Sequence, residues 1–138
     1  MRRTLSLAFA CVLLGLAAVA TASAESGAVV QKSWVSRGSG TPALTIVTPG
    51  SLTRVYANFV WGRTPKAGQT LRIQWLDPDG TVRAAWANKT LASDRKGDRL
   101  FSWVGAGVLA ANPGIWKAQL SVGGIVRSAR SFRVAQPA

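Results

Sequence analysis

One stretch near the end of the chain, residues 114–134, constrains the fold more than any other. From Trp116 to Val122, apolar residues alternate with polar ones. A period of two is typical of a strand with one buried face. Gly123 and Gly124 follow, and glycine accepts the positive φ angles that a tight reversal requires. The stretch therefore predicts a β-hairpin.

Burial favours one of two registers for this hairpin. A loop of the two glycines alone would set Trp116 opposite Ser131 and would bury an arginine. A loop that also includes Ile125 is compatible with a glycine bulge and avoids this burial. It gives the facing pairs Trp116 with Phe132 and Val122 with Val126. A slip of one residue moves every side chain to the other face, so we expect the second register.

The second register also places the basic residues of the hairpin. Lys117, Arg127 and Arg133 are expected on the outer face of the sheet. Arg130 would fall on the inner side, where an unpaired charge is costly, so we expect it near a sheet edge.

The remaining chain reads as further short strands separated by turns. Alternating or β-branched runs predict strands at 28–37, 43–47, 53–61, 71–75, 81–91 and 100–104. The sequence Asp77-Pro78-Asp79-Gly80 predicts a turn, because proline presets φ and glycine accepts the left-handed conformation. A single helical turn is expected at 108–111. About eight strands with turns between them predict an all-β, antiparallel sandwich.

A resemblance to a known family follows from these motifs. They are a G-x-W strand, a glycine turn, a final F-x-V strand and an upstream W-x-x-P-D-G-like hairpin. The residues are Gly114, Trp116, Gly123, Gly124, Phe132 and Val134, with Trp75, Pro78, Asp79 and Gly80 upstream. The arrangement, which covers most of residues 43–134, resembles the immunoglobulin-like modules of many bacterial exported proteins. It implies an immunoglobulin-like β-sandwich of about seven to nine strands. It also implies a module that binds or spaces other molecules, and it carries over no catalytic residue.

The first 24 residues have the composition of a secretory signal peptide. Arg2 and Arg3 precede a long apolar run, and small residues at 22–24 form a cleavage site. We expect a signal at 1–24 and one β-sandwich domain at 25–138. The rival interpretation is an uncleaved anchor, because the apolar run is nearly long enough to span a bilayer. After cleavage no membrane-spanning segment is expected.

Charge and cysteine content indicate the kind of partner and the cellular compartment. The formal net charge is +12, and it falls to +10 without Arg2 and Arg3. Such an excess favours contact with anionic surfaces, although it also serves solubility. The single cysteine, Cys11, lies in the signal, so no disulfide would stabilise the mature domain. These features indicate a bacterial periplasmic or secreted protein.

The residue types exclude most catalytic chemistry. The chain has no histidine, and its only cysteine and methionine lie in the leader. Triads, thiol nucleophiles and most transition-metal sites are thereby removed. We expect no catalytic residue, no metal and no cofactor. Asp77 and Asp79 fit turn chemistry better than a carboxylate pair, and Asp94 and Asp98 fit ion pairing with the neighbouring basic residues.

Tryptophan is the richest resource for binding. Trp61, Trp75 and Trp116 lie on the apolar faces of good strands and are expected in the core. Trp34, Trp86 and Trp103 are candidates for stacking on a sugar, a base or a partner side chain. Trp86 has Arg83 and Lys89 nearby, so the alternative to a core position for Trp86 is a flat patch of aromatic and basic side chains.

Three functional hypotheses follow, and none is enzymatic. The first is an exported interaction module that binds a protein partner, or an anionic envelope polymer or lipid, through basic residues. The candidate contacts are Arg63, Lys66, Arg83, Lys89, Arg95, Lys96, Arg99, Lys117, Arg127 and Arg133. The second is a carbohydrate-binding module that uses exposed tryptophans. The third is a small structural subunit of an envelope assembly. Specific nucleic-acid binding is not expected.

Overall fold

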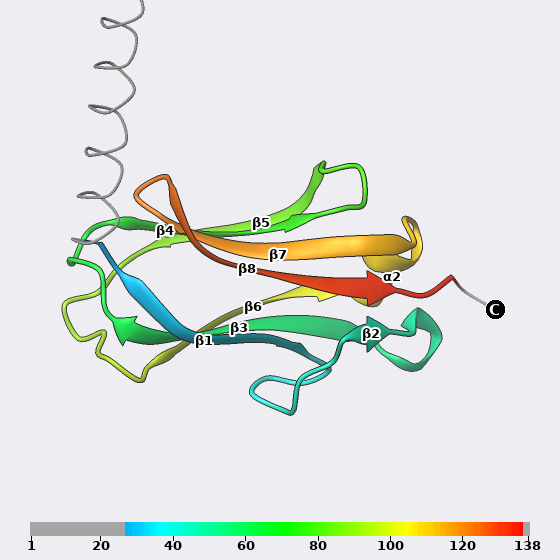
Figure 1. The fold of residues 1–138 in the computed structure, drawn as a ribbon, viewed down its shortest axis with the longest axis horizontal. Coiled ribbons are helices and arrows are strands. Elements are labelled where there is room, and N and C mark those ends of the chain that lie inside the picture. Colours follow the sequence, from blue (N-terminus) through cyan, green and yellow to red (C-terminus); the bar gives the residue numbers. More distant parts are fainter. Residues whose placement is uncertain (1–26, 137–138) are drawn as a thin grey trace, which may run out of the picture.

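Two β-sheets stacked as layers make up residues 27–136, the part of the chain that the computed structural model describes (Figure 1). Within these residues the elements in chain order are β1 (Val29–Ser36), β2 (Ile46–Val47), the 3-10 turn η1 (Pro49–Ser51), β3 (Arg54–Arg63), β4 (Thr70–Leu76), β5 (Val82–Lys89), β6 (Arg99–Gly105), the short helix α2 (Ala106–Ala110), β7 (Gly114–Val122) and β8 (Ile125–Val134). The predicted signal at 1–24 lies outside the described residues.

One sheet has three strands and the other has five. The three-stranded sheet has the order β1-β3-β6, and the five-stranded sheet has the order β2-β8-β7-β4-β5. The pairings are antiparallel except between β2 and β8, which run parallel. The all-β, mainly antiparallel sandwich predicted from the sequence is confirmed. No helix within 27–136 combines the length and the apolar character needed to cross a membrane.

The final hairpin has the predicted strand register but a different loop. Trp116 lies opposite Phe132, as expected. Val122 pairs with Ile125 rather than with Val126, so the loop is the two glycines alone, with φ of 57° and 86°. A register shift just before Ser121 absorbs the extra residue. The three-residue loop was therefore wrong, because the bulge sits inside the strand and not in the turn.

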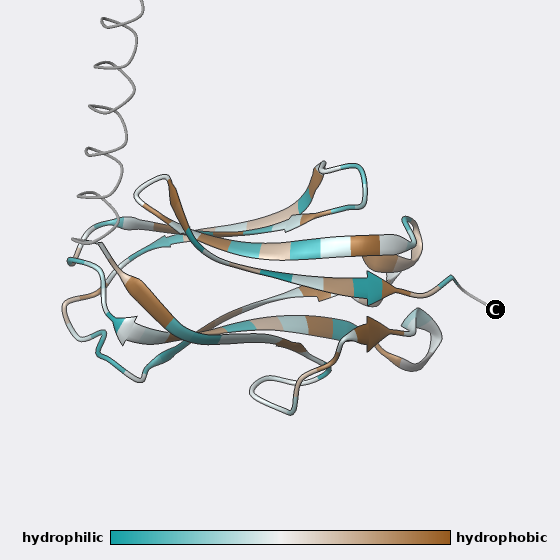
Figure 2. Cartoon of the chain, in the orientation of Figure 1, coloured by the Kyte–Doolittle hydropathy of each residue, from teal (hydrophilic) through white to brown (hydrophobic). Residues whose placement is uncertain are grey.

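The core lies between the sheets and is rich in aromatic rings. Trp61 is 2% exposed, and Trp75 and Trp116 are 0% exposed. The rings of Trp75 and Phe132 meet edge to face, 5.9 Å between centroids and 83° between planes. Figure 2 shows the alternation of hydrophobic and hydrophilic residues along β7 that buries one face of this strand. Trp61 belongs to the three-stranded sheet, whereas Trp75 and Phe132 belong to the five-stranded sheet, so both layers contribute large rings to the core.

Arg130 links the two sheets at an edge, as the sequence predicted. Its Nε donates to the Ser33 carbonyl oxygen at 2.9 Å and to Ser33 Oγ at 3.0 Å. Ser128 Oγ also lies 3.0 Å from Ser33 Oγ. At Arg130 β8 has no described partner on its outer side, because β2 pairs only with Arg133 and Val134. The charge therefore remains at the surface and ties β8 to β1.

Candidate binding surface

Aromatic side chains gather on the outer surface of the three-stranded sheet. The register sets two neighbouring rows: Trp34, Asn58 and Phe101, then Ser36, Tyr56 and Trp103. The rings of Tyr56 and Phe101 lie 6.0 Å apart. Phe101 is 42% exposed and Trp103 is 47% exposed. We call the surface made of Trp34, Tyr56, Phe101 and Trp103 the aromatic face.

The strand period places two cations on this face. Lys32 lies two residues before Trp34, and Arg99 lies two residues before Phe101, so each cation points the same way as its ring. Lys32 Nζ is 4.8 Å from the Trp34 ring centroid, and Arg99 Cζ is 4.7 Å from that of Phe101. Such contacts contribute about 0.5–1 kcal/mol at exposed sites. A K-x-W or R-x-F spacing in a strand is the signal that would have identified Lys32.

A third cation reaches the face from a different strand. Arg54 of β3 stacks on Trp103 of β6, with 4.0 Å from Cζ to the ring centroid. The sequence has no local signal for this pair, because only sheet pairing brings the two residues together. The four described carboxylates all lie in turns or loops: Asp77, Asp79, Asp94 and Asp98. No described carboxylate therefore occupies an outward position on the strands of the aromatic face.

A buried asparagine anchors the centre of the face. Asn58 is 0% exposed. Its Nδ2 donates to the Trp34 carbonyl oxygen at 3.2 Å and to Ser36 Oγ at 2.9 Å. Its Oδ1 accepts from Arg99 Nη1 at 2.8 Å and from Gly40 N at 3.3 Å. The alternation of strand 53–61 places Asn58 on the side opposite the buried residues Ala57 and Phe59. The side chain of Asn58 points outward, but neighbouring groups cover it. Its amide therefore stabilises the fold and is not available to a ligand.

The loop after β1, residues 37–41, forms part of this cover. Ser39 Oγ accepts a hydrogen bond from Arg99 Nη2 at 2.9 Å. The Thr41 carbonyl oxygen accepts one from Trp34 Nε1 at 2.8 Å. Arg99 and Trp34 are thus held by hydrogen bonds as well as by ring stacking. Of the ten predicted basic contacts, Arg99 is the one that lies on the aromatic face.

Several of the other predicted cations lie at one end of the sandwich. Arg63, Lys66 and Arg127 line a pocket of about 340 Å³ beside Gly27. The guanidinium of Arg127 packs so closely on Gly27 that a β-carbon there would collide with it. Arg127 is half-buried, so its expected place on the exposed outer face was wrong. The bulge that follows the turn explains this position.

The remaining predicted cations do not converge. Lys117 and Arg133 are exposed on the outer surface of the five-stranded sheet. Arg95 and Lys96 are exposed in the loop between β5 and β6. Lys89 Nζ donates to Thr70 Oγ1 at 2.8 Å across β4 and β5. Arg83 is held in an ion pair, described next.

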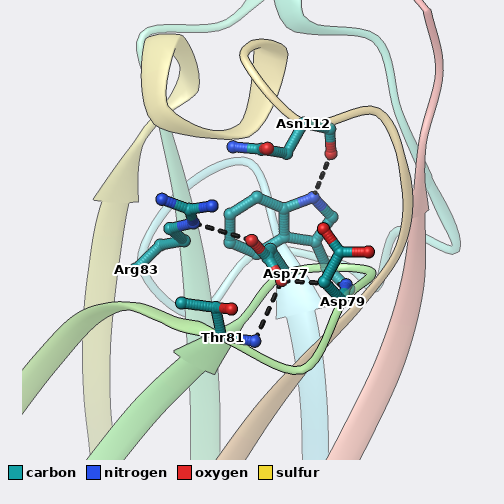
Figure 3. Close-up of polar contacts among 6 residues, drawn as sticks. Asp77, Asp79, Thr81, Arg83 and Asn112 are labelled. Atoms are coloured by element: carbon teal, nitrogen blue, oxygen red, sulfur yellow. Dashed lines mark hydrogen bonds and ion pairs between the residues drawn. The ribbon is translucent and has the colours of Figure 1, made fainter.

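Asp77 organises the turn between β4 and β5 (Figure 3). Its Oδ1 accepts from the backbone N–H groups of Asp79 at 2.9 Å and Thr81 at 3.0 Å. Its Oδ2 accepts from Arg83 Nε at 2.7 Å. The hydrogen bond from Arg83 lowers the pKa of Asp77 below 3.8, and the backbone N–H groups add to this against the opposing effect of burial. Turn chemistry is confirmed for Asp77, and Gly80 has the expected positive φ of 82°.

Asp94 and Asp98 stabilise the loop between β5 and β6 in a different way from that predicted. Asp94 Oδ2 accepts from Leu91 N at 2.8 Å, and Asp98 Oδ2 accepts from Arg95 N at 2.8 Å. Within the described residues, the ion pair found is that of Asp77 with Arg83. The expected pairing of these carboxylates with basic neighbours was therefore wrong, because backbone N–H groups reach them first.

The three tryptophans predicted as candidates for stacking lie at two adjoining sites, the aromatic face and a groove at its edge. Trp34 is half-buried on the aromatic face, and Trp103 is well exposed on it. Trp86 is half-buried and packs against the core from β5. It shares a groove of about 440 Å³ with Trp103, at the side of the sandwich where β5 and β6 end their sheets. The structure therefore brings Trp86 next to Trp103, while Trp34 lies two strands away.

No protein-family model and no curated protein matches the chain. Among solved structures it is similar to an immunoglobulin-like protein from Pseudomonas aeruginosa, with a TM-score of 0.53 and 14% identity over 78% of this chain and 96% of that chain. It is also similar to the sensor domain of an anti-sigma factor from Pseudobacteroides cellulosolvens, with a TM-score of 0.45 and 9% identity over 76% of this chain and 94% of that chain. A third similar structure is an alkylpurine DNA glycosylase from Pseudomonas fluorescens bound to DNA, with a TM-score of 0.48 and 16% identity over 79% of this chain and 30% of that chain. At these identities the first likeness bears on fold alone, and it confirms that the chain has an immunoglobulin-like β-sandwich fold.

Proposed function

We propose that this protein is a non-enzymatic, exported binding module whose aromatic face holds an anionic component of the cell envelope. One observation carries the proposal. Lys32, Arg54 and Arg99 each stack on an aromatic ring of a single sheet face, and within residues 27–136 no carboxylate occupies a strand position on that face. A cluster of cations without counter-charges attracts phosphate or carboxylate groups.

Ring stacking prepares these cations for binding. A guanidinium that lies flat on a ring keeps its N–H edge free for the oxygens of an anion. Arg99 uses two of its N–H groups on Asn58 and Ser39, and a guanidinium has more donors than these bonds consume. Fixing the side chain in advance also reduces the entropy lost on binding. Arg99 is therefore better prepared for an anion than an isolated surface arginine.

The non-enzymatic and exported parts of the proposal rest on sequence. The chain contains no histidine, and its one cysteine lies in the apolar leader. Within residues 27–136 no cluster of histidine, cysteine, aspartate and glutamate is arranged to hold a metal ion. Export follows from the composition of residues 1–24.

A second candidate function is supported by Trp103. An indole that is 47% exposed on a sheet face offers a stacking surface for a sugar ring. Arg54 lies against this same ring. The anionic ligand uses both groups, whereas a neutral sugar uses the ring alone, so the first function accounts for more of the surface.

The test measures binding to polygalacturonate and to phosphatidylglycerol vesicles, with neutral dextran and phosphatidylcholine vesicles as controls. At least one anionic probe should bind, with an affinity that falls steeply as salt rises. Binding to dextran with no salt dependence would instead favour the carbohydrate module. Failure of both anionic probes at low salt would reject the proposal for these ligand classes.

A further inference from the structure

The two sheets end side by side at the groove that holds Trp86. β6 is the last strand of the three-stranded sheet, and β5 is the last strand of the five-stranded sheet. Within residues 27–136 no strand pairs with the outer edge of either. The groove between them has a volume of about 440 Å³ and is lined by Ala85, Trp86, Phe101, Ser102 and Trp103.

Small side chains explain why the groove is hollow. Ser102 shares the inner side of β6 with Leu100 and Val104, since these three pair with the inward residues of β3. Its hydroxymethyl group leaves space that a larger residue would fill. Trp86 forms the opposite wall and packs against the core. The groove is therefore an apolar, half-open extension of the space between the sheets.

The edge of β6 is poorly protected against a further strand. An edge strand presents unpaired backbone N–H and C=O groups, and proteins usually protect it with proline, charges or bulges. The stretch Leu100–Val104 has no proline and no charge, and its pairing with β3 shows no register shift. Arg99 stands at one end of this stretch.

We propose that β6 accepts an extended segment of a partner protein as an added strand, and that this segment alternates acidic with apolar residues. An added strand would send alternate side chains to opposite faces of the sheet. On the inner side the apolar residues would enter the groove beside Trp86 and Ser102. On the outer side the acidic residues would lie beside Arg99 and Arg54, which stacks on Trp103.

Charge excludes a second copy of this chain as the occupant. The chain is strongly basic, with a formal net charge of +12. Antiparallel pairing of two copies through β6 would bring Arg99 of one copy towards the end of β6 where Arg54 stacks on Trp103 in the other copy. Like charges placed in this way destabilise a strand pair. These arginines would attract an acidic segment, whereas they would repel a second copy of the chain.

The direct test uses a capped peptide of about nine residues that alternates Glu with Val and Leu, the length of an ordinary strand. Its control has the same composition, with all the Glu residues at one end, so that charge is kept and alternation is lost. By fluorescence anisotropy the alternating peptide should bind at least about tenfold more tightly. Equal affinity of the two peptides would overturn the proposal.

Backbone methylation of the peptide separates strand addition from simple charge attraction. In an added strand, alternate N–H groups point to β6 and the others point to solvent. Two peptides N-methylated on alternate residues, with opposite parity, should therefore differ: one should lose binding about tenfold and the other should keep it. Loss of binding by neither peptide, or equal loss by both, would contradict strand addition.

Protein variants locate the segment. Arg54→Glu should weaken the alternating peptide about tenfold, whereas Lys32→Glu, an equal charge change on the far strand of the same sheet, should change it less than about twofold. Ser102→Phe fills the groove and should abolish binding, while Ser121→Phe on the other sheet should not. Trp86→Ala removes the opposite wall of the groove and should also weaken binding of the alternating peptide. Equal effects of the two charge reversals, or self-association of the chain at micromolar concentration, would reject the proposal.

Discussion

The two outer faces of the sandwich follow the same strand period but carry different chemistry. On the three-stranded sheet, outward positions hold aromatic rings with cations stacked on them. At the centre of the five-stranded sheet, outward positions hold glutamine, serine and alanine together with the unstacked cations Arg72 and Lys117. Gln119 Nε2 donates to Gln74 Oε1 at 3.3 Å. Ile46 and Ile115 are exposed at the end of that sheet, on either side of Arg133.

Under the proposed function, this difference distinguishes a surface that serves solubility from one that is prepared for a ligand. Small polar side chains meet water at little cost, whereas a cluster of exposed rings keeps apolar area in water. The rings of the aromatic face are also organised by a buried amide and a covering loop, features that solubility does not require. The predictions below compare the two faces, from the largest expected effect to the smallest.

Removing the buried amide should distinguish the faces most strongly. Asn58→Ala leaves Ser36 and the Trp34 carbonyl oxygen without their partner, and it frees Arg99. Loss of buried hydrogen bonds costs about 1–3 kcal/mol in the free energy of unfolding. Gln119→Ala, its control on the other face, should cost less than about 0.5 kcal/mol. Urea denaturation measures both, and equal losses would show that the aromatic face has no special support.

Neutralising cations should weaken anion binding on one face only. The double variant Lys32→Gln and Arg54→Gln should reduce affinity for the anionic probe about tenfold or more, since each basic residue near an anionic surface contributes about 1 kcal/mol. Lys117→Gln with Arg133→Gln removes the same charge from the five-stranded sheet and should reduce it by less than about threefold. Titration at low salt compares them. Matching losses would mean that net charge alone drives binding.

Acid should act on the five-stranded sheet through Asp77. Its pKa is lower in the folded protein than the ordinary 3.8 of the unfolded chain, so its contribution to stability is present above that value. The contribution is lost as the pH falls through the lower folded-state pKa. Asp77→Asn should therefore lower the melting temperature at neutral pH and flatten its dependence on pH below about 4. Anion binding at neutral pH should stay unchanged, because Asp77 lies in the β4–β5 turn of the other sheet.

Truncating the exposed indole should have the smallest effect on folding. Trp103→Ala removes a ring that is 47% exposed, so the free energy of unfolding should fall by less than about 1 kcal/mol. Binding to the anionic probe should fall about threefold, because Arg54 loses its support. A loss of stability as large as that expected for a core tryptophan, about 3–5 kcal/mol, would assign Trp103 to the core instead.

Local patterns in the sequence predicted the scaffold well. Alternation located the strands and the buried faces of Trp61, Trp75 and Trp116, and the clash of a charge with burial predicted the pairing of Trp116 with Phe132. These features depend on residues near one another in the chain. The bulge beside Ser121 could not be predicted, because a turn bulge and a strand bulge give the same pairing further along.

The candidate binding surface was harder to predict, since it is assembled from distant segments. Arg54 meets Trp103 only through the pairing of β3 with β6, and residues 37–41 contribute to the burial of Asn58 from a separate segment. Charge counting favoured the loop cations, which prove to be scattered. Lys32 could have been found, because its spacing from Trp34 puts both on one strand face. The sequence thus indicated aromatic and basic side chains as candidates, and tertiary pairing decides which of them lie together.

The most direct test of the central claim follows the six tryptophan indole N–H signals by NMR during titration with polygalacturonate or with small phosphatidylglycerol bicelles, whichever binds. If the aromatic face is the binding face, the signals of Trp34 and Trp103 should shift with the backbone signals of Lys32 and Phe101. The signals of the buried Trp61, Trp75 and Trp116 should stay in place. Shifts centred on Gln74, Lys117 and Gln119, or spread evenly over both sheets, would contradict the claim.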